Sequence, residues 1–314
     1  MGGMPHKLTS KPNKTMNANH NCHIYPFASA PLQHLAQSLA PLDGDEIELA
    51  WNTAYPDRHD THALFSENRT VLCMETPLIG RPNFQFDGSA DPERCFYRIA
   101  VNDPTAMGTG YVYDGTYQRF DRLLKLSGRT MRPWRQPAPE APILYALQVP
   151  GDNSLRGLDP YLAAFHDLLD IHRATRRRVI LGVHPDCHRD GWAIQRHRDY
   201  LPSFQKLANL AGHLGCHVLD PTSRLSDYFD SASMLVSHTS GTSFDALVDG
   251  LPCIALNDNN FASLATPRTV DFDATSMVDR RERLSWLSRI EWSWAEIGRG
   301  EHLGYVRDIL RNVK

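Results

Sequence analysis

The chain lacks long apolar runs, and no segment approaches the roughly 20 apolar residues needed to span a membrane. Its polar, lysine-containing beginning lacks the apolar core of a secretory signal. Its six cysteines lack paired spacing, which argues against a disulfide framework and fits a reducing compartment. We therefore expect a cytoplasmic protein without a membrane span.

Two further absences narrow the range of functions. The net charge of −3 is nearly neutral, so no overall field attracts nucleic acid or anionic lipid, although arginines cluster locally at 173–178 and 189–198. No Gly-x-Gly-x-x-Gly follows a predicted strand, which disfavours an oxidoreductase that binds a dinucleotide. The composition is that of a globular protein, and the 314 residues are enough for two domains of about 150 residues each.

The second half alternates between predicted strands and helices with short links. Each strand is an apolar run, which is typical of a strand buried on both faces. Asp159 and Pro160 are typical of a helix start, as N-cap and first helical residue. This order predicts a parallel sheet with helices on both faces. The predicted strands are 143–147, 179–183, 216–219, 234–236 and 252–256.

A proline-rich segment divides the chain. Its four prolines, between Met131 and Pro142, exclude a helix or a central strand and stiffen the connection. We expect a Rossmann-like α/β domain on each side of it. The predicted division is a disordered lead-in at 1–20, an N-terminal domain at 21–132, a linker at 133–142, a C-terminal domain at 143–278 and a helical tail at 279–314.

The segment 237–252 joins a predicted strand to a predicted helix through a turn rich in hydroxyls. Ser240, Gly241, Thr242 and Ser243 lie where a helix start leaves N–H groups without partners and where its dipole favours negative charge. The pattern predicts a site for a phosphate group. The alternative is plain capping of a structural helix, for which a single hydroxyl is enough.

Two other predicted strand ends carry residues suited to chemistry. Glu75 directly follows the strand at 71–74, beside a Gly/Pro loop, at the edge where open α/β sheets bind their ligands. His184 follows the strand at 179–183, and Pro185 restricts the turn after it; a structural histidine is the alternative interpretation.

Two groups of potential zinc ligands do not repeat at zinc-finger spacing, so we expect no metal and no other cofactor. These groups are His20, Cys22 and His23, and His184, Cys187 and His188.

Four segments resemble parts of a known family of glycosyltransferases. The segments 143–157, 179–185, 237–252 and 291–300 are similar to those of capsule-polysaccharide-type transferases and related phage-encoded proteins. The resemblance begins at Glu75 and is strongest in the second half. It implies the GT-B architecture, in which two Rossmann-like domains face an interdomain cleft, and it implies sugar transfer without a metal.

The resemblance also implies roles for individual residues. Glu75 is the expected catalytic base, and His184 would face the donor phosphate or the leaving oxygen. Asp245 stands where the family has a glutamate, and its shorter carboxylate would accept from a ribose hydroxyl. The expected donor-binding residues are Gln148, Gly151, Asp152, Ser154, His184, Ser240, Gly241, Thr242, Ser243 and Asp245. The acceptor-side candidates are Arg81, Asp87 and Asp114, and the alternative bases are Asp87, Asp114, His59 and His62.

The expected partner is therefore a nucleotide sugar, and the expected reaction moves its sugar to a hydroxyl group. Small phage-encoded relatives favour a 5-hydroxymethylated pyrimidine in double-stranded DNA as acceptor, in the host cytoplasm. The alternatives are transfer to a capsule or surface glycan, a sugar-nucleotide 2-epimerase, and a nucleotide-binding module without catalysis.

Overall fold

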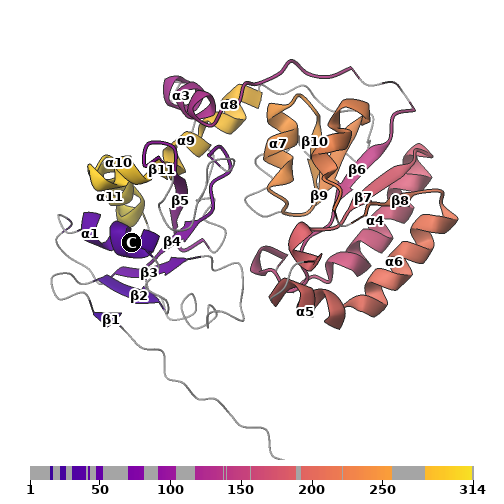
Figure 1. Cartoon of the computed structure of the whole chain (residues 1–314), viewed down its shortest axis with the longest axis horizontal. Helices are drawn as coiled ribbons and strands as arrows, with labels where there is room; N and C mark the ends of the chain where they lie inside the picture. Colours follow the sequence, from indigo (N-terminus) through magenta and orange to yellow (C-terminus); the bar gives the residue numbers. More distant parts are fainter. Residues whose placement is uncertain are drawn as a thin grey trace, which may run out of the picture.

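The structure is a computed structural model, and two separate sheets organise it, one formed mainly by the first half of the chain and one by the second half (Figure 1). It describes residues 15–16, 22–25, 30–39, 42, 47–51, 70–80, 91–103, 117–136, 138, 140–155, 157–188, 192–220, 222–256 and 280–312.

The sheet of the second half has five parallel strands in the order β10-β9-β6-β7-β8. This confirms the parallel sheet that the alternation of strands and helices predicts. Each strand begins and ends within one or two residues of its predicted bounds. The strands are β6 (Ile143–Ala146), β7 (Val179–Gly182), β8 (His217–Val218), β9 (Met234–Ser237) and β10 (Cys253–Ala255).

Both faces of this sheet are buried, which explains its apolar strands. On β6, Ile143 and Tyr145 pack with helices α4 (Pro160–Thr175) and α6 (Leu201–His213). Leu144 and Ala146 point to the opposite face and pack with helix α7 (Thr242–Val248). Because successive side chains of a strand alternate between faces, an unbroken apolar run is what two covered faces require.

The helices of the second half begin where local chemistry predicts. The carboxylate of Asp159 accepts hydrogen bonds from the N–H groups of Tyr161 and Leu162, at 2.9 and 3.1 Å, and Pro160 is the first residue of α4. These bonds satisfy donors that a helix start leaves without partners. The remaining elements of this half are η3 (Asn153–Leu155), η4 (Pro185–His188), α5 (Trp192–Asp199) and η5 (Leu225–Ser231).

The sheet of the first half is mixed. Its order is β1-β2-β3-β4-β5-β11, with parallel pairs only from β2 to β4 and antiparallel pairs elsewhere. The apolar runs of this half identified strands but contained no signal for their direction. The elements are β1 (Thr15–Met16), β2 (Cys22–Tyr25), α1 (Ala30–Ser38), β3 (Ile47–Trp51), β4 (Val71–Glu75), β5 (Phe96–Val101) and α3 (Gln118–Leu126).

The last part of the chain returns to the first sheet. It was expected to be helical, and it also contains strand β11 (Glu291–Ser293), which pairs with β5. Ser293 and Glu296 form a capping box at the start of the helix that follows, with reciprocal bonds of 3.1 and 2.8 Å. The helices of this part are α8 (Arg280–Ser285), α9 (Leu287–Ile290), α10 (Trp294–Gly298) and α11 (Leu303–Arg311).

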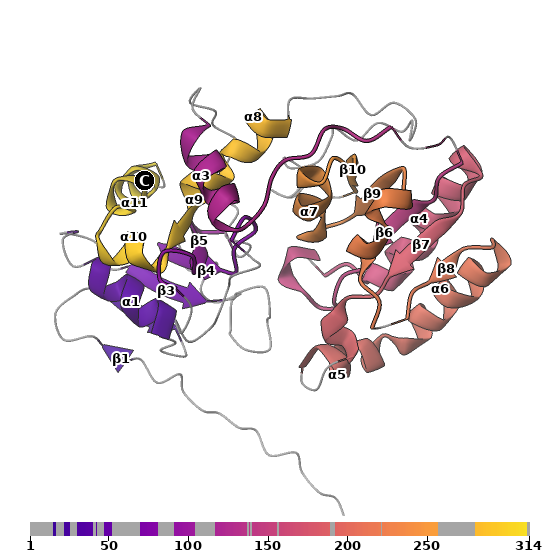
Figure 2. The same ribbon diagram turned by 45° about the horizontal axis from the view of Figure 1, so that its top comes forward.

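One cluster of buried apolar side chains includes residues of both halves. Phe96 of β5 and Phe120 of α3 belong to it together with Leu235 of β9 and Phe244 of α7. Figures 1 and 2 show α3, α8 and α9 beside one another, next to the segment that leads across to β6. The two sheets are therefore joined by packing as well as by the chain itself.

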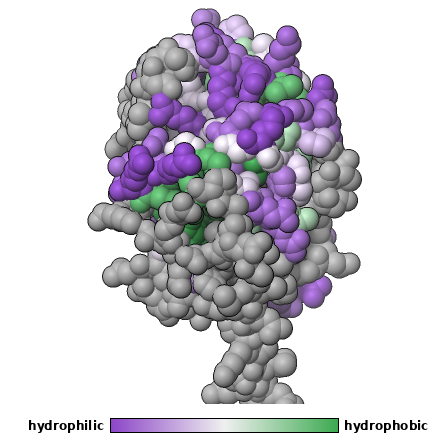
Figure 3. Space-filling model, turned by 90° about the vertical axis from the view of Figure 1, so that its left-hand side faces the viewer, coloured by the Kyte–Doolittle hydropathy of each residue, from purple (hydrophilic) through white to green (hydrophobic). Residues whose placement is uncertain are grey.

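Two surface properties complete the description. None of the helices in the described residues is long and apolar enough to cross a membrane. On the side shown in Figure 3, hydrophilic residues cover much of the upper part, and a group of hydrophobic residues lies at mid-height toward the left.

Candidate functional site

The carboxyl ends of β6, β7 and β9 lie at the same edge of the second sheet, because these strands are parallel. The loop that follows β6 contains Gln148 and Asp152, the loop after β7 contains His184, and the turn after β9 contains Ser240. The fold thus brings together residues that three separate segments contribute.

Thr239 joins two of these loops, and the sequence analysis did not identify it. Its hydroxyl lies 2.8 Å from the hydroxyl of Ser154 and accepts a bond of 3.1 Å from the side-chain amide of Gln148. The amide N–H of Ser154 in turn donates to Asp152 Oδ1 at 2.8 Å. Gln148, Asp152 and Ser154, predicted as donor-binding residues, therefore form one network with Thr239.

The network keeps one buried acceptor available. Gln148 Oε1 is buried and has no hydrogen-bond partner among the described residues. A buried polar atom without a partner costs about 1–3 kcal/mol, so a ligand hydroxyl or N–H that reaches it would be bound favourably. Gly151 has φ 78°, a conformation that glycine adopts without strain, and it allows the chain to turn toward Asp152.

The hydroxyl-rich turn after β9 satisfies much of its own hydrogen bonding. The N–H of Thr242 donates to Ser240 Oγ at 3.3 Å, and the N–H of Ser243 donates to the carbonyl of Ser240 at 3.0 Å. The hydroxyl of Ser243 is buried and lies 2.8 Å from that of Ser237. Ser243 thus holds the turn together, and a contact between its hydroxyl and a donor stays a prediction.

Asp245 lies in the first turn of α7, and an arginine pairs with it. Its Oδ1 is 2.6 Å from Arg129 Nη1, and the guanidinium of Arg129 also lies over the ring of Phe244 at 5.4 Å. About a quarter of the Asp245 side chain is exposed, at 28%. Its carboxylate is therefore held by the segment that joins the halves and is still in reach of solvent.

His184 has a defined orientation at the end of β7. Its Nδ1 accepts a hydrogen bond of 3.3 Å from the N–H of Asp186, and its carbonyl accepts from the N–H of Cys187 at 3.0 Å. An Nδ1 that accepts an N–H carries no proton, so the neutral ring holds its proton on Nε2. His184 can therefore donate from Nε2 to an oxygen of a ligand.

Glu75 comes to the site from the other sheet. It ends β4, its side chain is buried, and its Oε1 accepts from the N–H of Thr76 at 2.6 Å. Burial raises the pKa of Asp152 to about 6, hydrogen bonds from Ser154 oppose that rise, and the negative charge of Glu75 adds to it. The carboxylates of Glu75 and Asp152, one from each half, are thus close enough to influence each other.

A buried histidine beside the turn was also not identified from the sequence. His238 Nε2 lies 3.0 Å from Asp167 Oδ2, and Tyr145 donates to the same oxygen at 2.6 Å. Burial and the charge of Asp167 raise the pKa of Tyr145 well above its ordinary value, so this phenol stays protonated. The three side chains fix α4 to the end of β9 and hold the backbone that leads into Thr239.

Several predicted residues lie outside the described residues. They are the acceptor-side candidates Arg81, Asp87 and Asp114, and the alternative bases His59 and His62. Within the described parts of the chain, no group of three or more histidine, cysteine or carboxylate side chains is arranged to hold a metal ion.

Comparison with known proteins found relatives by structure alone. No family model and no curated protein sequence matches the chain. Among solved structures, Thermosulfurimonas dismutans KpsC, a beta Kdo 2,7 transferase, is similar with a TM-score of 0.49 and 15% identity, over 88% of this chain and 89% of its own. The beta Kdo 2,4 transferase of the same KpsC is similar with a TM-score of 0.43 and 14% identity, over 76% and 78%. Both likenesses are distant, so the functional argument depends on the site itself.

Proposed function

We propose that the chain is a glycosyltransferase that moves a sugar from a nucleotide-sugar donor to a hydroxyl acceptor. The observation that carries the proposal is a polar network on one sheet with a buried carboxylate from the other sheet near it. The polar network lies at the carboxyl edge of the parallel sheet, and the buried carboxylate of Glu75, from the other sheet, is close enough for its charge to raise the pKa of Asp152 in that network. A donor bound at the polar network would have its sugar directed toward Glu75.

The polar edge has the groups that a nucleotide diphosphate or monophosphate needs. With Nδ1 accepting from the N–H of Asp186, His184 would donate a hydrogen bond from Nε2 to a phosphate oxygen. Ser240, Gly241 and Thr242 add hydroxyl and backbone groups from the turn after β9, at the same edge of the sheet. Gln148 Oε1 and the exposed part of Asp245 are acceptors for sugar or ribose hydroxyls.

In the proposed reaction, the acceptor oxygen forms a bond to the anomeric carbon while the bond from that carbon to the donor's phosphate oxygen breaks. Glu75 takes the proton of the acceptor hydroxyl, and His184 donates a hydrogen bond to the departing phosphate. Positioned proton transfer of this kind contributes on the order of 100- to 10,000-fold to a rate. Nucleotide and glycosylated acceptor are the two products.

The more detailed part of the proposal concerns which acceptor receives the sugar. A hydroxymethylated pyrimidine in DNA is the acceptor that the resemblance favoured, and a surface glycan is the alternative. The net charge of −3 does not favour DNA, since most affinity for a duplex comes from cationic contacts with phosphates. The experiment below therefore tests both acceptors separately.

The test is a panel of nucleotide sugars, including an activated form of Kdo, the sugar after which both KpsC transferases are named. Each donor is incubated with hydroxymethylated duplex DNA, with oligosaccharide acceptors, or with no acceptor, and the products are read by mass spectrometry. Release of nucleotide and a gain of one sugar mass are expected only when an acceptor is present. Conversion of a donor without acceptor would indicate an epimerase instead.

Glu75→Gln is expected to lower kcat by about 100-fold or more while leaving donor affinity unchanged, because it removes the base and keeps the shape. Glu48→Gln is the matched control, since Glu48 is a buried glutamate of the same sheet at the opposite end of its strands. Equal losses in both variants, or binding of nucleotide with no transfer from any donor, would contradict the proposal.

A further inference from the structure

Three buried charged residues form a row across neighbouring strands of the first sheet. Arg98 of β5 is paired in register with Glu75 of β4 on one side and with Glu291 of β11 on the other. Residues paired across antiparallel strands share a face of the sheet, so the three side chains follow one another on the same face. The exposed fractions of Arg98, Glu75 and Glu291 are 4%, 7% and 0%.

The middle and last members of the row also hold the loop that follows Glu75. The carboxylate of Glu291 accepts hydrogen bonds from the N–H groups of Leu78, Ile79 and Gly80, the last two at 3.0 and 3.2 Å. Arg98 Nε donates to the carbonyl of Thr76 at 2.6 Å. Every residue from Thr76 to Gly80 except Pro77 is therefore bonded to Glu75, Arg98 or Glu291.

Space is tight where this loop meets the sheet. A Cβ atom at Gly80 would lie only 2.4 Å from the ring of Phe96, so the loop is pressed against β5. Burial raises the pKa of Glu291, and the three amides and Arg98 oppose that rise. Buried ion pairs are often no more stabilising than apolar residues of the same size, so stability alone does not account for this row.

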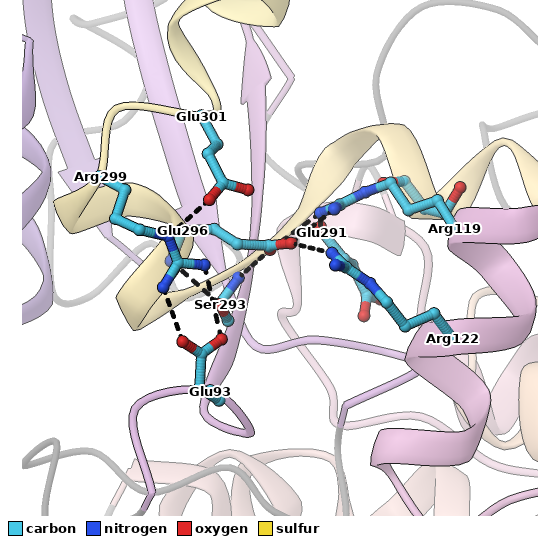
Figure 4. Close-up of polar contacts among 9 residues, drawn as sticks. Glu93, Arg119, Arg122, Glu291, Ser293, Glu296, Arg299 and Glu301 are labelled. Carbon is cyan, nitrogen blue, oxygen red and sulfur yellow. Dashed lines mark hydrogen bonds and ion pairs between the residues drawn. The ribbon is translucent and has the colours of Figure 1, made fainter.

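The three residues of the row come from distant parts of the chain. Glu291 comes from the segment that returns to the first sheet, more than 200 residues after Glu75. That segment is also anchored by Glu296, which bonds with Arg119 and Arg122 of α3 (Figure 4). The structure therefore offers two buried glutamates in the same returning segment, and of these two Glu291 is the one that contacts the loop after Glu75.

We infer that Glu291 and Arg98 are positioning residues for Glu75 in the proposed sugar transfer, and this rests on the proposed function. Arg98 sets the direction of the Glu75 end of β4, and Glu291 fixes the loop through its backbone. The C-terminal segment thereby completes the acceptor-side part of the site. A displacement of about 1 Å at a reacting group can cost on the order of 100-fold in rate, which is the scale of effect that positioning can have.

The test compares Glu291→Gln with Glu296→Gln in the full chain. Glutamine at position 291 offers an N–H₂ where amide N–H groups now donate, so the loop should loosen. We expect kcat to fall about 10- to 100-fold with the KM for the donor unchanged, and amide hydrogen exchange to accelerate at 78–80. Glu296→Gln weakens the anchoring of the same segment, and it should lower the melting temperature while leaving kcat within about twofold.

A second variant makes the result independent of whether Glu291→Gln folds. Arg98→Lys keeps the charge but replaces a planar group with a point donor, and it should produce the same loss in kcat without a change in donor KM. Unchanged kcat in Glu291→Gln or Arg98→Lys would overturn the inference, as would an equal loss in Glu296→Gln. A wild-type chain that transfers no sugar from any donor would overturn the proposed function, and the inference with it.

Discussion

At the scale of single residues, the pKa of Asp152 is a measurable consequence of the geometry of the site. Its carboxyl is 8% exposed, one oxygen accepts from the N–H of Ser154, and Glu75 faces it from the other half. These surroundings raise its pKa from 3.8 to about 6. Between these pH values the folded protein binds a proton that the unfolded chain releases.

Replacing Asp152 with asparagine should therefore stabilise the protein at neutral pH. Because the folded pKa of Asp152 lies above the unfolded value, the wild type loses free energy of unfolding as pH rises from about 4 to 6. The amide variant does not titrate and has no such loss, so Asp152→Asn should be more stable by roughly 1–3 kcal/mol at pH 8 and equal to wild type at pH 4. Urea unfolding at both pH values checks this, and a difference that does not change with pH would contradict it.

At the scale of elements, α3 holds the returning C-terminal segment. Arg119 donates to both oxygens of Glu296 and to the carbonyls of Ser288 and Glu291, and it lies over the ring of Trp292 at 4.3 Å. Arg122 bonds only with Glu296 in the described contacts, and 55% of its side chain is exposed. The two arginines pair with the same buried carboxylate, but Arg119 has several further contacts and Arg122 is largely exposed.

The two arginines should therefore differ in their contribution to stability. Arg119→Met leaves the buried carboxylate of Glu296 with the exposed Arg122 as its cationic partner, and it should lower the free energy of unfolding by roughly 2–4 kcal/mol. Arg122→Met should lower it by less than about 1 kcal/mol, because exposed ion pairs contribute little. Chemical denaturation of both variants provides the comparison, and equal losses would mean that burial does not decide the effect.

A second element-scale contact joins the linker to the end of α7. Gly250 has φ 87°, and a Cβ atom there would lie 2.0 Å from the carbonyl oxygen of Pro133. The linker also bonds to this end of the helix, with the N–H of Arg135 donating to the carbonyl of Gly250 at 2.9 Å. The linker backbone cannot approach in this way if residue 250 has a side chain.

Gly250→Ala should destabilise the protein by more than about 2 kcal/mol, since a strained backbone and a steric conflict add together. Gly212→Ala is the matched control, because Gly212 lies in α6 with open space around its Cβ position. Alanine in a helix should stabilise that site by about 0.5–1 kcal/mol. Melting temperatures that shift in the same direction for both variants would contradict the predicted difference.

At the scale of the whole molecule, two buried groups in different halves titrate over the same pH range with opposite effects. His302, at the start of α11, is fully buried and bonds with Ser38 at 3.1 Å. Burial, with a smaller effect of His34, lowers its pKa from 6.5 to about 4. The unfolded chain therefore binds a proton at His302 that the folded protein excludes.

The two titrations should largely cancel in the wild type. The effect of His302 lowers the free energy of unfolding by up to about 3 kcal/mol as pH falls from 6.5 to 4, while that of Asp152 raises it as pH falls from 6 to 4. His302→Gln removes the first effect, so its stability should rise relative to wild type as pH falls. Unfolding measured from pH 4 to 8 checks this, and parallel curves for wild type and variant would contradict it.

Much of the fold followed from local patterns. The strand at Ile143–Ala146 and the Asp159 cap are confirmed, because alternation and capping act within a few residues. The placement of Gln148, Asp152 and Ser154 in one network also agrees with a sheet edge predicted from parallel strands. The roles assigned to these residues, and to Glu75, stay predictions.

The parts that local patterns missed all depend on pairing between distant segments. Strand direction in the first sheet, the return of β11 to β5, and the carboxylate of Glu291 on the loop after Glu75 join residues far apart in the chain. One signal was present in the sequence: Arg98 is a charged residue inside an otherwise apolar strand. A buried charge of this kind implies a partner, but the sequence does not indicate which residue that partner is. Local chemistry specified the strands, the helix ends and the polar edge. Only tertiary packing decided which charges meet, because burial makes an unpaired charge too costly to leave alone.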